Sequence, residues 1–292
     1  MELSAKIDLH MHSSVSDGTD SPAELLQKVK DEDIALFSVT DHDAVKACSE
    51  IISLLDGDSP AFFTGAEFSC RDEDGKYHIL GYGYDPDSDS MKELTDAGHA
   101  IRIGKLQRRL DQLKEEYGIE FPDHEVDVLR KLDNPGKPHL GNLMAKYGFA
   151  EDRNTAIRNV LNNLHVKSEY IRPETAIDCI LRGGGIPVLA HPAFGDGDQL
   201  IMNDEMDRRL KKLTSMGLQG VEAFYSGFSP RLMQDMIDFA DRYSLYVTAG
   251  SDYHGKNKLI KLGDTGIDYM REVPMSLYRF IRDIQDRMYG IF

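Results

Sequence analysis

The chain has 292 residues, of which 41% are hydrophobic and 29% are charged, and its formal net charge is −16. This composition is typical of a globular protein in water, and no apolar run reaches the roughly 18 residues of a membrane span, which excludes an integral membrane protein. The negative charge repels polyanions and argues against extended binding of nucleic acid, but it allows a small anionic substrate.

The N-terminal segment and the cysteines indicate the cellular compartment. A strand is predicted almost at Met1, which leaves no room for a secretory signal peptide, so we expect a cytoplasmic protein without a membrane partner. Cys48, Cys70 and Cys179 are odd in number and lack the CxxC spacing, which favours reduced thiols over a disulfide framework. The sequence does not indicate the oligomeric state.

Seven short β-rich segments alternate with longer amphipathic ones. In a chain of this length, the alternation predicts an α/β barrel in which parallel strands are joined by crossover helices. The predicted strands cover residues 5–12, 35–41, 61–68, 77–84, 185–191, 218–224 and 245–250.

Helix start signals follow several of these strands. Ser21, Pro22 and Glu24 form a predicted capping box with proline at the first helical position, and apolar residues then recur at helical spacing. Further helices are predicted within residues 229–244 and 273–288. These helices would return the chain from one parallel strand to the next.

A long helical region interrupts the alternation. Residues 90–118 are predicted to form one long helix, shorter helices follow, and no confident strand pattern intervenes. We therefore predict a helical insertion domain at residues 88–175 that covers the active-site mouth. The catalytic barrel would then be formed by residues 1–87 and 176–292.

Histidines occur in or just after the predicted strands. In the first strand, Asp8, His10 and His12 are two residues apart and therefore project from the same side. Because the strand ends of a barrel meet at one mouth, six of the ten histidines are expected to converge there. The six are His10, His12, His42, His78, His191 and His254.

Three carboxylates accompany these histidines and bring the number of candidate metal ligands to nine. The carboxylates are Asp17, Glu67 and Asp252. Histidine and carboxylate groups bind borderline divalent cations such as Mn²⁺, Zn²⁺ or Fe²⁺, and nine ligands suffice for two or three ions bridged by Glu67. Packing so many partly charged groups together without a cation would be strongly unfavourable.

The ordered motifs of the chain resemble those of one phosphoesterase family. The segments "DLHMHSSVSDG", "VTDHD", "GAEFSC" before "YHILGYG", "LAHP" and "GSDYHG" are similar to the successive motifs of the PHP (polymerase and histidinol phosphatase) family. The resemblance covers most of the chain. It implies a distorted, TIM-barrel-like (β/α)7 barrel with a trinuclear metal centre at its C-terminal mouth and hydrolysis of phosphate esters.

The resemblance also implies which residues share an ion. The implied sets are His10, His12, Glu67 and Asp252 for the first ion, Glu67, His78 and His191 for the second, and Asp17, His42 and His254 for the third. The histidinol phosphatase branch typically has histidine at the position of Asp17. The chain therefore resembles more closely the nucleoside 3′,5′-bisphosphate phosphatase-like branch, which also carries a helical insertion.

Substrate contacts are predicted in the insertion and after two strands. The segment "NPGKPHLGNLM" resembles the part of this branch that faces the substrate, so Lys137 and His139 are candidate phosphate ligands; the alternative for Lys137 is a solvated side chain. Where many relatives have an arginine soon after "HP", this chain has Ala193 and Phe194. The candidate replacement contacts are Tyr225, Ser226 and Arg231, although a tyrosine there also suits simple packing.

The expected reaction follows from metal chemistry. Metal coordination lowers the pKa of bound water from 15.7 to about 7, so the expected nucleophile is a metal-bridging hydroxide, with His191 or Asp252 transferring protons. We expect hydrolysis of phosphate esters of small nucleotides or phosphorylated sugars, including cyclic phosphodiesters. The alternatives are an exonuclease acting at the 5′ end of short RNA, and a metal-dependent binding module without catalytic activity.

Overall fold

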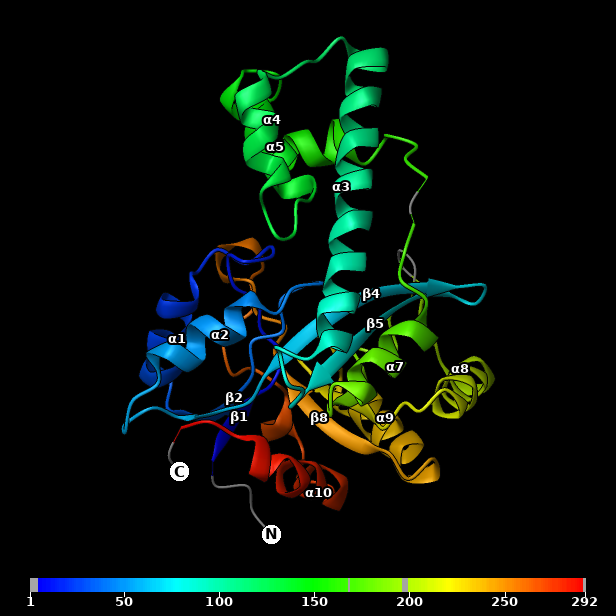
Figure 1. Cartoon of the computed structure of the whole chain (residues 1–292). Helices are drawn as coiled ribbons and strands as arrows, with labels where there is room; N and C mark the ends of the chain where they lie inside the picture. The colour runs from blue at the N-terminus through cyan, green and yellow to red at the C-terminus, as the bar shows by residue number, and fades with distance from the viewer. Residues whose placement is uncertain (1–4, 168, 196–198, 291–292) are drawn as a thin grey trace. The chain divides into compact units, whose positions relative to one another are not determined.

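The computed structural model describes residues 5–167, 169–195 and 199–290. Two compact units make up the chain (Figure 1): Met1–Thr95 together with Ile171–Phe292, and Asp96–Tyr170. The second unit lies within the predicted insertion at 88–175, although helix α3 (Asp89–Tyr117) begins before the first residue of this unit. The role of this unit as a cover over the active site stays a prediction.

The strands of the first unit form two sheets. The three-stranded sheet has the order β1-β2-β3 and is parallel, and the five-stranded sheet has the order β4-β5-β6-β7-β8. The strands are β1 Lys6–Asp8, β2 Ile34–Phe37, β3 Ala61–Phe62, β4 Gly65–Asp72, β5 Gly75–Tyr82, β6 Ile186–Leu189, β7 Gly220–Tyr225 and β8 Tyr246–Gly250.

The hairpin of β4 and β5 differs from the predicted all-parallel arrangement. Strand β5 runs antiparallel to both β4 and β6, because the turn from Asp72 to Gly75 is too short for the crossover that parallel strands need. Gly75 has a φ of +127°, and the Asp74 N–H donates to Asp72 Oδ1 at 2.8 Å. Lys212 of helix α8 (Asn203–Ser215) pairs with Asp72 at 2.9 Å and Asp74 at 2.8 Å, which holds the turn to this helix.

Isolated backbone hydrogen bonds connect the two sheets. On one side the Leu9 N–H donates to the Ala249 carbonyl at 2.9 Å, and on the other the Glu67 N–H donates to the Asp41 carbonyl at 3.2 Å. Among the residues that the structure describes, however, the strands do not form one continuous closed sheet. The α/β class is thus confirmed, while the (β/α)7 barrel stays a prediction.

The helices begin largely where the capping signals predict. At α1, the Ser21 N–H donates to Glu24 Oε2 at 2.8 Å and Ser21 Oγ accepts from the Glu24 N–H at 3.3 Å, so the predicted capping box is present. The α-helices are α1 Pro22–Asp31, α2 Lys46–Leu54, α3 Asp89–Tyr117, α4 Asp123–Arg130, α5 Lys137–Lys146, α6 Arg153–Ala156, α7 Pro173–Arg182, α8 Asn203–Ser215, α9 Pro230–Arg242 and α10 Met275–Ile284. Short π or 3-10 helices occur at Ile157–Leu161, Gly255–Asn257, Ile267–Tyr269 and Gln285–Arg287.

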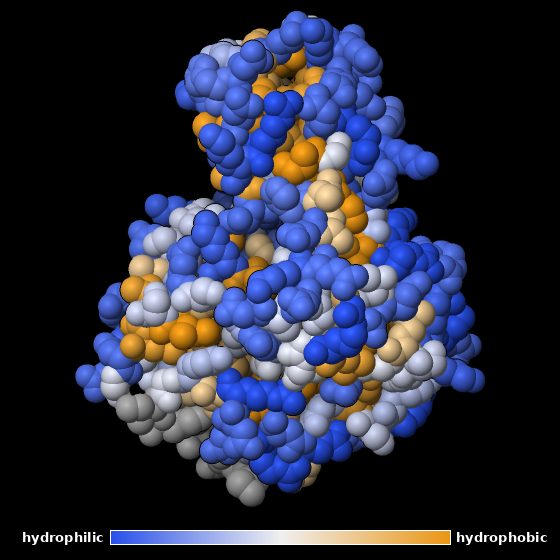
Figure 2. All heavy atoms as spheres, in the orientation of Figure 1, coloured by the Kyte–Doolittle hydropathy of each residue, from blue (hydrophilic) through white to orange (hydrophobic). Residues whose placement is uncertain are grey.

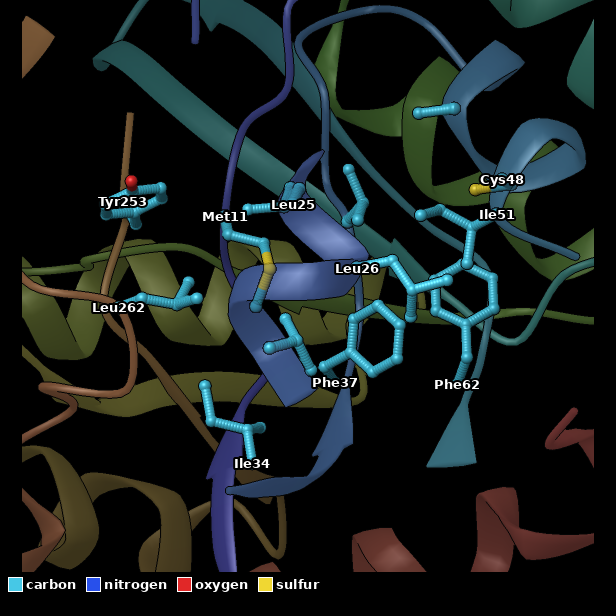
Figure 3. Close-up of a cluster of buried hydrophobic side chains, with 13 residues drawn as sticks. Met11, Leu25, Leu26, Ile34, Phe37, Cys48, Ile51, Phe62, Tyr253 and Leu262 are labelled. Atoms are coloured by element: carbon cyan, nitrogen blue, oxygen red, sulfur yellow. The ribbon is translucent and has the colours of Figure 1, made fainter. Parts of the chain in front are cut away.

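The core of the first unit lies between the strands and these helices. Met11 packs in a buried cluster with Leu25 of α1 and Phe37 of β2 (Figure 3), and all three side chains are fully buried. Burial of each such side chain contributes about 1.5–3 kcal/mol. Ile7 and Leu9 are also buried, as the alternation of the first strand predicts.

The second unit has its own hydrophobic cluster. Leu106 and Leu113 of α3 pack with Leu140 and Met144 of α5, and all four side chains are buried.

Figure 2 shows a mostly hydrophilic visible face, in line with the high charged fraction. In the described part of the chain, no helix has both the length and the apolar character required to cross a bilayer.

Candidate metal centre

The segments that follow β1 and β8 lie side by side and bring the first candidate ligands together. The His12 N–H donates to the Tyr253 carbonyl at 2.8 Å, and the Asp252 N–H donates to the His10 carbonyl at 2.8 Å. The buried Asp8 carboxylate fixes the second segment, since it accepts from the Ser251 N–H at 2.9 Å and Ser251 Oγ at 2.6 Å. Two distant parts of the sequence therefore meet at one buried position.

Glu67 of β4 lies at the centre of the histidine cluster. Its carboxylate is within 4 Å of five imidazoles, while its side chain is only 1% exposed. The distances from Glu67 are 2.7 Å to His78 Nδ1, 3.0 Å to His42 Nδ1, 3.1 Å to His191 Nε2, 3.4 Å to His12 Nε2 and 3.5 Å to His10 Nε2. The predicted bridging carboxylate thus contacts histidines that lie in or after several different strands.

A second group of side chains surrounds Asp17. Its Oδ1 lies 3.2 Å from His254 Nε2 and 3.8 Å from His12 Nδ1, and its Oδ2 lies 4.0 Å from His42 Nε2. The ring centroids of His12 and His254 are 4.0 Å apart. His12 and His42 therefore stand between the Asp17 group and the Glu67 group.

Asp252 has two differently engaged oxygens. Oδ1 lies 3.4 Å from His12 Nε2 and 3.6 Å from His10 Nε2. Oδ2 accepts from the Tyr225 hydroxyl at 2.9 Å and from Lys258 Nζ at 2.6 Å. One oxygen therefore faces the histidines while a tyrosine and a lysine hold the other.

The nitrogen atoms of the cluster fit a site for cations. The Nε2 atoms of His10 and His12 are buried beside Glu67 and Asp252, and within the described residues neither of them makes a hydrogen bond. Buried polar atoms without partners are costly, and imidazole nitrogens beside carboxylates are suitable ligands for divalent cations. In three groups the potential ligand atoms lie within 4.8 Å of one another: His12, Asp17, His42 and His254; His10, His12 and Glu67; and His42, Glu67 and His78.

These groups differ in detail from the sets that the resemblance implies. Asp17, His42 and His254 fall together as expected, and Glu67 is shared between two groups. His42 also lies close to Glu67, although none of the implied sets places these two residues on the same ion. The assignment of each residue to a particular ion stays a prediction.

Proton equilibria keep the site rich in negative charge. Burial alone would raise the pKa of Glu67, but its close approach to the imidazoles of the cluster holds this pKa well below its usual range. The pKa values of Asp17 and Asp252 are lowered in the same way despite burial. Burial lowers the pKa of His78 to about 3, so this imidazole stays neutral. Ionised carboxylates beside this neutral imidazole attract cations.

Glu222 is a functional candidate that the sequence analysis missed. It lies in β7, is fully buried, and places Oε1 2.9 Å from His10 Nδ1. Its Oε2 accepts from the His191 N–H at 2.7 Å. A carboxylate bonded to the second nitrogen of a ligand histidine fixes the orientation and tautomer of the ring. The signal in the sequence was a glutamate inside an otherwise apolar strand.

The backbone is strained at two candidate ligands. His191 has a φ of 28° and Asp252 a φ of 59°, values that residues other than glycine adopt infrequently. Such conformations persist where surrounding contacts hold them, and they are frequent at functional sites. The bonds of Glu222 to His191 and of Tyr225 to Asp252 are contacts of this kind.

The predicted substrate contacts have different surroundings. Tyr225 binds Asp252, and Ser226 Oγ donates to the Ser251 carbonyl at 2.7 Å, so both belong to the framework of the centre. Arg231 is exposed in the first turn of α9, and none of the described contacts of the centre involves it. The role of all three residues in substrate binding stays a prediction.

Lys137 and His139 lie in the first turn of α5, in the unit of residues 96–170. Lys137 Nζ donates to Asn162 Oδ1 at 2.7 Å, and His139 Nδ1 accepts from the Gly136 N–H at 3.1 Å. Partial burial and the neighbouring charge of Arg109 lower the pKa of Lys137. Lys137 is therefore not fully solvated, and its predicted contact with phosphate remains a prediction.

Comparison with known proteins identifies similar sequences along almost the entire chain. The sequence profile of the PHP domain matches residues 8–237. The "3′,5′-nucleoside bisphosphate phosphatase" of Chromobacterium violaceum is 26% identical over 290 residues, covering 97% of this chain and 98% of the relative. The "phosphoribosyl 1,2-cyclic phosphate 1,2-diphosphodiesterase" of Eggerthella lenta is 28% identical, covering 85% and 94%.

A third relative has a different substrate in its name. The "5′-3′ exoribonuclease" of Haemophilus influenzae is 27% identical, covering 89% of this chain and 94% of the relative. All three names describe hydrolases of phosphoester bonds. This agreement confirms the predicted reaction class, while the substrates differ from one relative to another.

Solved structures share the fold. An amidohydrolase from Chromobacterium violaceum, determined with bound sulfate and no metal, superposes with a TM-score of 0.78 at 26% identity and covers 98% of each chain. A protein from Bifidobacterium adolescentis superposes with a TM-score of 0.78 at 23% identity, covering 100% of this chain and 99% of that one. The fold therefore extends over the full length of both proteins.

Proposed function

The chain belongs to the PHP domain family, and we propose that it is a metal-dependent hydrolase of phosphate esters in small nucleotides or phosphorylated sugars. The observation that carries this proposal is the convergence of six histidines and three carboxylates around Glu67 and Asp17. The buried Nε2 atoms that lack hydrogen bonds support cation binding in particular.

The proposed ligands are the nine residues predicted from the sequence. The donor set suits two or three Mn²⁺, Zn²⁺ or Fe²⁺ ions. When bound, such ions activate water as a nucleophile and neutralise charge on the phosphate oxygens. The ligands are His10, His12, Asp17, His42, Glu67, His78, His191, Asp252 and His254.

The surrounding residues hold these ligands in place. When His10 donates its Nδ1 proton to Glu222, the lone pair of Nε2 is directed into the centre. Tyr225 and Lys258 bind Asp252 Oδ2 and leave Oδ1 for the centre. Rigid positioning of this kind reduces the reorganisation needed during reaction.

His191 is the better placed of the two candidates for proton transfer. It lines a pocket together with His78, and its backbone N–H is fixed by Glu222. Asp252 is less suited, because despite its burial the charges of His10 and Lys258 hold its pKa well below the usual range. A group with so low a pKa carries no proton to donate near neutral pH. The roles of Lys137, His139 and the insertion in substrate binding rest on the sequence resemblance alone.

A panel of phosphate esters tests the proposal. The metal-loaded protein is incubated with nucleoside 3′,5′-bisphosphates, nucleoside monophosphates, cyclic phosphates and phosphorylated sugars, and released phosphate or ring-opened product is measured. We expect hydrolysis of at least one class. If every ester survives with each of the three metals while metal still raises the melting temperature, a non-catalytic binding module becomes the better account.

A 5′-3′ exoribonuclease is the second candidate function. The relative from Haemophilus influenzae and two further relatives carry this name. A pocket that holds only the terminal phosphate of an RNA would not require an extended basic surface, so the net charge of −16 does not exclude an exoribonuclease. Release of labelled mononucleotides from a short 5′-phosphorylated RNA, in the absence of ester hydrolysis in the panel, would favour this candidate.

A further inference from the structure

Asn257 links the backbones of two candidate metal ligands that are far apart in the sequence. Its backbone N–H donates to the His254 carbonyl at 3.3 Å, and its side-chain Nδ2 donates to the Asp17 carbonyl at 2.6 Å. We propose that Asn257 is a positioning residue: it holds Asp17 beside His254 and so completes a cation site in the Asp17 group that is separable from the Glu67 group. The inference rests on the proposed function and deepens it by identifying contacts that only one of the ions requires.

The bond to Asp17 fixes the orientation of the Asn257 amide. A backbone carbonyl can only accept a hydrogen bond, so the NH₂ group of the side chain must face it. An ionised aspartate has a similar shape but only acceptor oxygens. The variant Asn257→Asp therefore removes the bond, adds a negative charge and leaves the size of the side chain almost unchanged.

Two further hydrogen bonds join the residues that flank these two ligands. The Lys256 N–H donates to Thr19 Oγ1 at 3.0 Å, and the Tyr253 hydroxyl donates to Asp20 Oδ2 at 2.7 Å. Gly255 has a φ of 64°, and a Cβ atom at this position would lie only 2.0 Å from Thr19 Oγ1. The two ligand-bearing segments therefore pack too closely to admit a larger side chain between them.

The side chains of the two ligands are arranged for a shared cation. His254 Nδ1 lies 2.9 Å from the Asp252 carbonyl, so in the neutral imidazole Nδ1 carries the proton and Nε2 presents a lone pair. Nε2 lies 3.2 Å from Asp17 Oδ1. Two acceptor atoms this close repel each other, and a cation bound by both removes the repulsion.

The Asp17 group is held differently from the Glu67 group. Glu67 and His78 belong to β4 and β5, whose backbones are paired along both strands. The Glu67 side chain is 1% exposed, whereas that of Asp17 is 33% exposed. Paired strands fix the first pair of ligands, while the position of Asp17 depends on contacts of an irregular segment. We therefore expect the ion of the Asp17 group to bind last and most weakly.

Binding of Mn²⁺ to chelator-treated protein tests the inference without relying on activity. Free Mn²⁺ is measured by electron paramagnetic resonance while the ion is titrated into wild type and variants. Asn257→Ala should weaken the last-binding equivalent about 10- to 100-fold and change the tighter equivalents less than about 2-fold. Asn163→Ala is the matched control, because Asn163 Nδ2 also donates to a backbone carbonyl, that of Asn159 at 2.7 Å, within the unit of residues 96–170.

The variant Asn257→Asp separates positioning from simple attraction. An added negative charge alone would strengthen cation binding, whereas loss of the bond to the Asp17 carbonyl should weaken it. We expect the last equivalent to bind more weakly than in wild type, as in Asn257→Ala. Asn257→Gln keeps a donor on a longer side chain and should bind this equivalent more tightly than Asn257→Ala does. Tighter binding by Asn257→Asp than by wild type would overturn the inference.

A double-mutant cycle shows whether Asn257 acts through Asp17. Asp17→Asn removes the charge of the ligand itself, so this variant should lose the last equivalent. Addition of Asn257→Ala to Asp17→Asn should then cause no further loss of metal binding, because both changes affect one site. An additional loss among the tighter equivalents would contradict a role confined to the Asp17 group.

The remaining outcomes separate the inference from the proposed function. Circular dichroism and the melting temperature of the metal-free protein identify variants that do not fold; Thr19→Val, which removes only the hydroxyl that accepts from Lys256, is then the second test and should weaken the same equivalent. If wild type binds Mn²⁺ and hydrolyses esters but Asn257→Ala binds Mn²⁺ equally well, the inference fails and the proposed function stands. If Mn²⁺ binding depends on Asn257 as expected but no ester is hydrolysed, the proposed function fails and the positioning role stands.

Discussion

Replacement of Glu222 by glutamine tests how the centre is held together. The side chain is fully buried and accepts two hydrogen bonds, from His10 Nδ1 at 2.9 Å and from the His191 N–H at 2.7 Å. Glutamine has the same shape but only one acceptor oxygen, and its amide group is a donor. The glutamine can therefore accept only one of the two hydrogen bonds.

Both orientations of the glutamine amide are unfavourable. If its oxygen faces His10, the NH₂ group opposes the His191 N–H and leaves a buried donor unpaired. If its oxygen faces the His191 N–H, the NH₂ group requires His10 Nδ1 as an acceptor, which moves the proton to Nε2 and removes the lone pair from the centre. An unpaired buried donor costs about 1–3 kcal/mol, and loss of such an outer contact typically lowers metal affinity or activity about 10- to 100-fold.

Metal content after dialysis, melting temperature and kcat/KM for the best ester of the panel are measured for Glu222→Gln and wild type. We expect metal affinity and kcat/KM to fall about 10- to 100-fold together. Glu272→Gln, at an exposed carboxylate, should match wild type in all three measurements. Full metal affinity and activity in Glu222→Gln would refute the positioning role.

Three further predictions concern the centre and the core. Asp17→Asn removes the negative charge near His254 and His42, so it should abolish turnover and lower the metal content measured by elemental analysis. Its circular dichroism spectrum should stay native, and an active variant would contradict the ligand assignment. Removal of metal by a chelator should lower the melting temperature, because the closely packed carboxylates then lack a cation, and added metal should restore the melting temperature. An unchanged melting temperature would argue against a metal centre. Burial raises the pKa of the Cys48 thiol to about 11 from its ordinary 9.0, so native protein should resist alkylation at pH 8. Because the folded pKa lies above the unfolded one, this thiol should make the free energy of unfolding decrease as pH rises from about 9 to 11, and rapid alkylation of native Cys48 would contradict its burial.

The location of the candidate centre was predictable because strand ends carry its residues. His10 and His12 alternate just after β1, His78 lies within β5 and the remaining histidines follow other strands, so their convergence was expected from the general geometry of α/β folds. The family prediction is confirmed by the profile match. The helix signal at Ser21 was predictable for a local reason, since a capping box involves only four consecutive residues.

Features that depend on pairing between distant segments were harder to predict. The antiparallel hairpin of β4 and β5 depends on the turn from Asp72 to Gly75, whose sequence "DEDG" contains a hairpin signal that the expected alternation of strands and helices obscured. Glu222 was missed because a single glutamate in an apolar strand is only a weak local signal. Its partners, His10 and His191, are 212 and 31 residues away, and only the folded arrangement reveals them.

Titration of metal into chelator-treated protein most directly tests the central claim that this histidine and carboxylate cluster is a catalytic metal centre. Bound metal and the rate of phosphate ester hydrolysis are measured in the same samples. We predict that hydrolysis is absent without metal and rises as two or three equivalents bind, and that Asp17→Asn shows neither the full stoichiometry nor the activity. Undiminished hydrolysis by protein shown to be free of metal would contradict the account.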